Sequence, residues 1–202
     1  MAGGPVSVNT AMISLGLAQV RIGASATNIA QINRCLGSAA SIGSLANTKF
    51  ISNVDFWNHE SGFPLKEDLS VPIRESAALE CNFEEITPYN LALARGLDPA
   101  SYNKTPLSGE IALGALTTPS YVRMESIYTY PDGQDQMAMI FPRAQVASST
   151  ELDFQKEDNV KPPIMITSKR ADSTISGGNA VWDDMPLGRV YWTAYSAEYA
   201  GA

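Results

Sequence analysis

The segment Thr48–Trp57 reads TKFISNVDFW, and its alternation of apolar and polar side chains predicts a β-strand. Successive side chains of a strand point to opposite faces, so the segment divides into two sets. One face carries Phe50, Ser52, Val54 and Phe56, and the other carries Ile51, Asn53, Asp55 and Trp57. From this segment onward a period of two dominates the chain, which indicates a mainly β fold.

Further alternating segments follow, separated by turn residues. The stretch 58–68 is rich in polar residues, Gly and Pro, so we expect an exposed loop there. Strands are expected over 69–73 and 77–83, and Pro72 indicates an edge, a bulge or a strand end. Later strands are expected over 110–116, 121–130, 136–141, 144–155, 164–170 and 189–197, with a hairpin turn at 131–134.

One short helix is predicted after the strand at 77–83. Thr87 can cap its first amide groups, Pro88 suits the first helical position, and Gly96 can adopt the left-handed conformation beyond its end. A weaker apolar spacing predicts a second helix over 26–36. About eight or nine strands beside one short flanking helix favour a mainly β fold, either a β-sandwich or a β-barrel.

Composition and charge narrow the class of protein. Among 202 residues, 14 Lys and Arg face 21 Asp and Glu, giving a net charge of −7 that opposes capture by nucleic acid or anionic membrane. No apolar stretch approaches the roughly 18 residues of a membrane span, so we expect a soluble protein made in the cytoplasm. We interpret residues 1–15 as an N-terminal arm and 16–202 as a single β domain.

The sequence contains few side chains in patterns that support catalysis or metal binding. His59 is the only histidine, and it lies in the expected loop without a neighbouring nucleophile pattern. Cys35 and Cys81 lack metal-finger spacing and are expected to be inert thiols. Adjacent carboxylates on a strand point to opposite faces, so we interpret the acidic pairs as a solvated surface. We therefore expect no catalytic, metal or cofactor site, and no enzyme.

Two segments carry a family resemblance. The first is LECNFEEIT at 79–87, which runs into NLALARGL at 90–97; the second is MIFPRAQV at 139–146, followed by ELDFQKED at 151–158. Together, over roughly 48–170, the chain resembles the major tail tube proteins of tailed bacteriophages. The long front, rich in Ala, Gly and Ser, and the segment after residue 170 depart from this pattern.

The resemblance implies a tail-tube-like β-sandwich with a flanking helix. It implies stacked hexameric rings that form a hollow conduit for DNA ejection in the virion tail, synthesised in the host bacterial cytoplasm. The implied partners are further copies of the chain, tape-measure, tail terminator and baseplate or tail-tip proteins, and a sheath where the tail contracts. DNA would pass without specific binding, since carboxylates that line a lumen repel phosphates.

Other functions stay open at this stage. The inner tube of a contractile injection particle would use the same fold. A self-contained β-sandwich module for capsid decoration or adhesion is a different class, and a carboxylate-dependent hydrolase ranks last. Assembly into rings separates the first two functions from the others.

Two groups of site residues follow from the tube interpretation. The loop over 58–68 is expected to contact the next ring, because it joins two amphipathic strands and presents apolar and charged residues together. Its candidate residues are Asn58, Glu60, Phe63, Leu65, Lys66, Glu67 and Asp68. The candidate lumen acids are Asp55, Glu80 and Glu84, which lie opposite the apolar faces of their strands.

Overall fold

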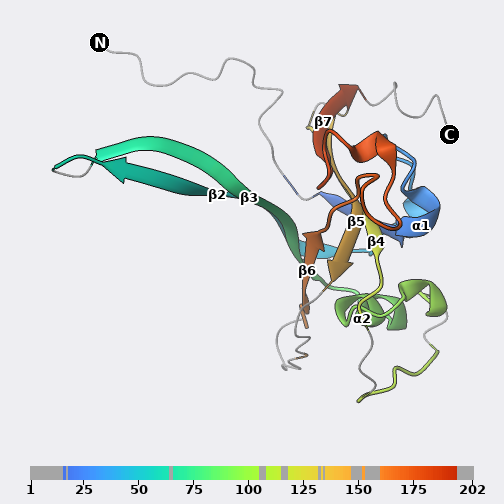
Figure 1. Cartoon of the computed structure of the whole chain (residues 1–202). Helices are drawn as coiled ribbons and strands as arrows, with labels where there is room; N and C mark the ends of the chain where they lie inside the picture. The colour runs from blue at the N-terminus through green and yellow to red at the C-terminus, as the bar shows by residue number, and fades with distance from the viewer. Residues whose placement is uncertain are drawn as a thin grey trace, which may run out of the picture.

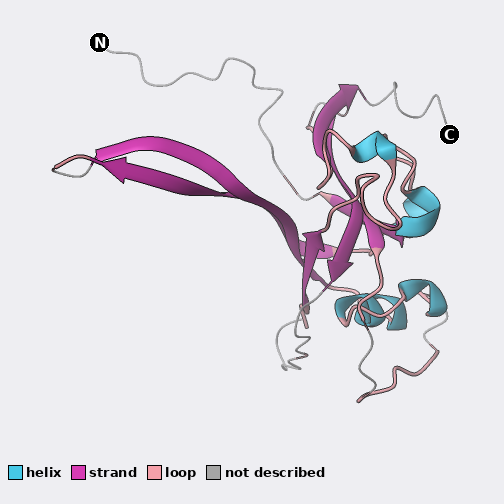
Figure 2. Cartoon of the chain, in the orientation of Figure 1, coloured by secondary structure: helices cyan, strands magenta, loops and turns pink. Residues whose placement is uncertain are grey.

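The structure, a computed structural model, describes residues 16, 18–63, 66–104, 108–114, 118–131, 133, 135–146, 152 and 160–194. The N-terminal segment, residues 1–15, which the sequence indicates to be an N-terminal arm, lies outside this part of the chain. The strands are β1 (Gln19–Ala24), β2 (Leu45–Ser61), β3 (Lys66–Phe83), β4 (Val122–Thr129), β5 (Asp135–Val146), β6 (Pro163–Ser168) and β7 (Arg189–Ala194). The α-helices are α1 (Ser25–Asn28) and α2 (Pro88–Ala94), and short 3-10 helices cover Ser38–Ala40, Pro99–Ser101 and Ala180–Trp182. Figure 2 shows how strands dominate the molecule.

All seven strands belong to one antiparallel sheet, so the prediction of a mainly β fold is confirmed. The order is β1-β4-β5-β6-β3-β2, and β7 pairs with β5 beside this path. The sheet does not close into a barrel, because β1 and β2 stand at opposite ends of the order. It nevertheless curls, since Val20 of β1 and Leu79 of β3 belong to the same buried core.

The molecule has a body and a projecting hairpin, which we call the arm from here on (Figure 1). The body holds the main core, in which apolar residues of β1, β3, β4, β5 and β6 pack together with α2. A smaller cluster lies around Ile140, where Trp182 is fully buried and its Nε1 donates to the Ile29 carbonyl oxygen at 2.6 Å. The arm is the outer part of the β2–β3 hairpin, which projects away from the body.

Helix α2 forms as its capping residues predict. The Thr87 side chain accepts a hydrogen bond from the Asn90 amide, and Pro88 occupies the first helical position. At the other end, Gly96 has φ +73°, and the amides of Gly96 and Leu97 bond back to Leu93 and Ala92 in a Schellman motif. A Cβ at residue 96 would meet the Val146 carbonyl oxygen at 2.6 Å, so glycine is required sterically as well.

The prediction of a loop over 58–68 is wrong for most of this stretch. Strand β2 continues to Ser61 and β3 begins at Lys66, so the polar residues of this stretch form cross-strand pairs. The two strands expected over 69–73 and 77–83 are likewise one strand, β3. Pro72 is accommodated as expected, because the register shifts between the pairs Asp55–Arg74 and Phe56–Pro72, which leaves a bulge there.

Other boundary predictions also need correction. The helix expected over 26–36 is limited to the four residues of α1, because the Arg123 guanidinium binds the carbonyl oxygens of residues 28, 31 and 33. Residues 110–114 are not a strand. The strands expected over 136–141 and 144–155 are one strand, β5, up to Val146. The described residues thus hold seven strands, where eight or nine were predicted.

Candidate functional site

The arm is the most exposed regular structure among the described residues. Every described residue from 52 to 75 is exposed, although all but the turn residues lie in strands β2 and β3. About ten residues of each strand project from the body, which corresponds to roughly 33 Å at the rise of an extended strand. An isolated two-stranded hairpin has little stability of its own in water.

The register of β2 and β3 defines two faces of the arm. We call core-side the face that continues Leu79, Cys81 and Phe83, which are buried in the body. On the arm this face carries Val54, Phe56, Asn58 and Glu60 from β2, with Glu67, Ser70, Pro72 and Glu75 from β3. The outer face carries Asn53, Asp55, Trp57, His59 and Ser61 from β2, with Lys66, Leu69, Val71, Arg74 and Ser76 from β3.

Two of the candidate lumen acids, Asp55 and Glu80, lie on the outer side of the hairpin. Asp55 stands directly across from Arg74, and the Glu80 carboxylate lies 3.5 Å from Lys49 Nζ. Glu84, just beyond β3, accepts a hydrogen bond from the Ser44 hydroxyl at 2.7 Å. Bases therefore accompany two of the three acids, which makes this face closer to neutral than the sequence suggested. Their position in a lumen stays a prediction.

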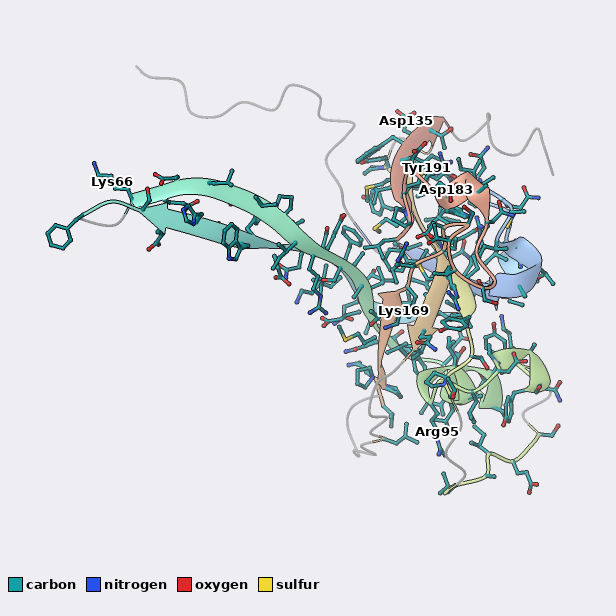
Figure 3. The ribbon with its side chains drawn as sticks, in the orientation of Figure 1. Lys66, Arg95, Asp135, Lys169, Asp183 and Tyr191 are labelled. Carbon is teal, nitrogen blue, oxygen red and sulfur yellow. The ribbon has the colours of Figure 1, made fainter. Side chains whose placement is uncertain are left out.

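The candidate inter-ring residues gather around the arm tip. Asn58 and Glu60 lie in β2, and Lys66, Glu67 and Asp68 lie in β3. Phe63, in the turn, is fully exposed at 103%, whereas Leu65 lies outside the described residues. Figure 3 labels Lys66 at this end of the ribbon, far from the body. The tip thus presents an aromatic ring among charged side chains.

Sequence reasoning missed the acidic character of the core-side face. Glu60 and Glu67 are register partners, and Glu75 is paired with Val54 on the same face. Within the described part of the arm, no Lys or Arg shares this face. Like charges directly across from one another destabilise a strand pair. The pairing could not be read from the sequence, because it depends on the bulges that set the register.

Apolar side chains are exposed along the outer face. Trp57 is 51% exposed and its indole stacks on the His59 imidazole, with ring centroids 5.7 Å apart. Leu69 and Val71, which stand across from His59 and Trp57, are exposed as well. Large apolar groups that lie together on a surface mark contact sites more often than polar ones do. His59, expected in a loop, is thus a strand residue of this apolar face.

Neither a cluster that could hold a metal ion nor a helix that could span a membrane occurs among the described residues. No group of three His, Cys, Asp or Glu among them is placed to hold a metal ion. None of the helices in this part of the chain has the length and apolar character needed to cross a membrane. Burial raises the pKa of the Cys81 thiol to about 12; partial desolvation of the exposed Cys35 thiol, with the neighbouring Glu125 carboxylate, raises its pKa to about 11. Both thiols are therefore overwhelmingly protonated at neutral pH.

The geometry defines a class of protein: a mainly β protein whose single sheet extends into a projecting, partly apolar hairpin arm. Comparison with models of protein families finds no match for the chain, and comparison with curated proteins finds none either.

Proposed function

We propose that this chain is a structural subunit of a phage tail tube. In this proposal the copies form hexameric rings, the rings stack, and the hollow stack conducts DNA during ejection. The observation that carries the proposal is the arm, an exposed two-stranded ribbon with apolar side chains on both faces. The segments at 79–97 and 139–158, which carry the resemblance to tail tube proteins, flank or follow this arm.

The arm supports assembly through its energetics. Burying apolar surface contributes about 25 cal/mol per Å², so covering side chains such as Phe56, Trp57, Leu69 and Ile73 is worth several kcal/mol. Wherever one copy of the chain is present, further copies are present as well, so another copy is a partner that is always available. A symmetric assembly of identical copies therefore covers every arm in the same way.

The sheet edge supports the same conclusion. Strand β2 ends the strand order, so its far side has no strand neighbour among the described residues. An unprotected edge strand readily accepts a strand from another chain. The other end of the sheet is partly covered, because the Ile42 amide donates to the Val20 carbonyl oxygen beside β1. Edge pairing through β2 would join neighbouring copies into a continuous sheet.

The charge of the chain suits a conduit. A wall that carries excess Lys and Arg would hold DNA through its phosphates, whereas the net charge of this chain is −7. Carboxylates on either face of the arm would repel the strand and let it slide. The function in this proposal is mechanical and electrostatic, without chemical turnover.

Shortening the arm tests the proposal. Joining Asp55 to Arg74 through an Asn-Gly turn removes residues 56–73 and keeps a register pair of the native hairpin. We expect the shortened protein to keep its cooperative unfolding and to sediment as a monomer, whereas the full chain forms rings and tubes. Unchanged ring formation by the shortened protein would contradict the role of the arm.

A further inference from the structure

The arm tip and the body carry complementary surfaces. At the tip, the exposed Phe63 is flanked by the acidic register pair Glu60–Glu67. On the body, a cavity of about 720 Å³ opens beside β1, α1 and the end of β5, and Arg143 and Tyr121 line it. The cavity is large enough to receive an aromatic side chain, and its wall carries a base.

One base, Arg143, lines this cavity, and a second, Lys169, lies next to Arg143. The Arg143 guanidinium lies 3.8 Å from the Tyr121 ring centroid and donates one hydrogen bond to the Arg170 carbonyl oxygen. The Lys169 amide donates to the Arg143 carbonyl oxygen, so the two bases are neighbours. Figure 3 places Lys169 on the body, far from Lys66 at the tip.

The acids near the cavity have hydrogen-bond partners of their own. Asp98, which also lines the cavity, accepts a hydrogen bond from the Ala100 amide. Asp172 is bound by Arg170 at 2.9 Å and by the Thr174 amide. Arg143 and Lys169 have no carboxylate partner in the described part of the chain. They remain the bases that can meet an incoming carboxylate.

We infer that the arm tip of one copy docks into this cavity of a second copy, with the Phe63 ring inserted and Glu60 and Glu67 facing Arg143 and Lys169. The occupant is a second copy because the arm projects away from its own body and cannot reach its own cavity (Figure 1). The inference deepens the proposed function, on which it rests, by naming the surface that receives the tip.

The contact has consequences for symmetry and for charge. Tip and cavity are different surfaces, so the contact is head-to-tail and repeats until it closes a ring or continues along a stack. The like-charge pair at the tip, which destabilises the free arm, becomes favourable when it meets two bases. The tip therefore gains stability on assembly.

Disulfide trapping tests the docking. In a background of Cys35→Ser, which removes the exposed native thiol, Phe63→Cys is combined with Ser176→Cys at the exposed rim of the cavity. The matched control combines Phe63→Cys with Leu113→Cys, which lies in the other large apolar groove, beside α2. Each full-length protein is oxidised at a concentration where the wild type assembles, then separated on a non-reducing gel.

We expect the pair 63/176 to give a ladder of covalent oligomers, and the pair 63/113 to give none. Phe63→Asp should also raise the concentration needed for assembly roughly tenfold or more, while Leu113→Asp leaves it unchanged. A ladder from 63/113 instead, or from neither pair although the wild type forms tubes, would overturn the docking and leave the tube function intact. A wild-type protein that never assembles would overturn both.

Discussion

At the residue scale, the body is organised by a buried ion pair. Arg123 and Glu125 are both fully buried, and Arg123 Nε lies 2.8 Å from Glu125 Oε1. The guanidinium also donates to the carbonyl oxygens of residue 28, at the end of α1, and of residues 31 and 33 beyond it, and the carboxylate accepts from the amides of Cys35 and Leu36. The pair therefore replaces helical hydrogen bonds in this segment, which explains why the apolar spacing over 26–36 predicted a helix that does not form.

Glu125→Gln tests the ion pair. The substitution keeps the size of the side chain and removes the charge that balances Arg123, so an unpaired guanidinium remains buried. We expect the free energy of unfolding to fall by about 3 kcal/mol, measured by urea denaturation. The control Glu80→Gln removes one partner of an exposed pair with Lys49 and should change it by less than about 1 kcal/mol. Equal losses in the two variants would contradict the role assigned to Arg123 and Glu125.

Tyr89 gives the body a measurable pH dependence. Burial, reinforced by the charge of Asp98, raises the pKa of the Tyr89 phenol from 10.0 to about 12. The folded state thus favours the neutral phenol, whose contribution is complete below pH 10 and is lost as the pH rises toward 12. We expect Tyr89→Phe to lose less stability than the wild type between these limits, by urea denaturation at several pH values. Parallel losses would show that the phenol does not titrate with unfolding.

At the element scale, local and non-local signals differ in what they reveal. Helix α2 was predictable because its signals are local: Thr87, Pro88 and Gly96 each affect backbone groups only a few residues away in the chain. The arm was not, because a polar composition over 58–68 resembles a loop, whereas the β2–β3 pairing depends on residues far apart in the chain. The bases across from Asp55 and Glu80 escaped prediction for the same reason. The faces of the strands could be predicted, but not their partners.

Deleting 62–66 tests the tip. The deletion removes the turn and Phe63 and leaves most of the β2–β3 pairs, so the body and the shaft of the arm should fold as in the wild type. We expect folded subunits whose tubes are short or missing, observed by electron microscopy together with circular dichroism. Tubes of normal length would refute the assignment of the tip to contacts between rings.

A triple substitution of Asp55, Glu80 and Glu84 with Lys tests the candidate lumen acids. If these residues line the channel, the new positive charges attract phosphates, so DNA ejection from intact tails should slow, and added salt should weaken the effect. The matched variant with Gln at the same positions should slow ejection less. Unchanged ejection at low salt from intact Lys-substituted tails would show that these acids lie off the path of DNA.

At the scale of the whole molecule, the described residues form a body with a buried core and an exposed arm. The body buries its core around a curled sheet, and α2 caps one side of that core. The arm presents apolar side chains to solvent, and in the proposed assembly another copy of the chain would cover them. The mainly β class could be predicted from the period of two. The separation into body and arm could not, because polar residues and a proline interrupt the alternation within β2 and β3 and make these strands look shorter than they are.

Negative-stain electron microscopy of the purified wild-type protein, over a range of concentrations, tests the central claim most directly. The proposal predicts hexameric rings that stack into hollow tubes at high concentration, with the same protein present in purified virions. Isolated globules at every concentration, together with absence of the protein from purified particles, would contradict it.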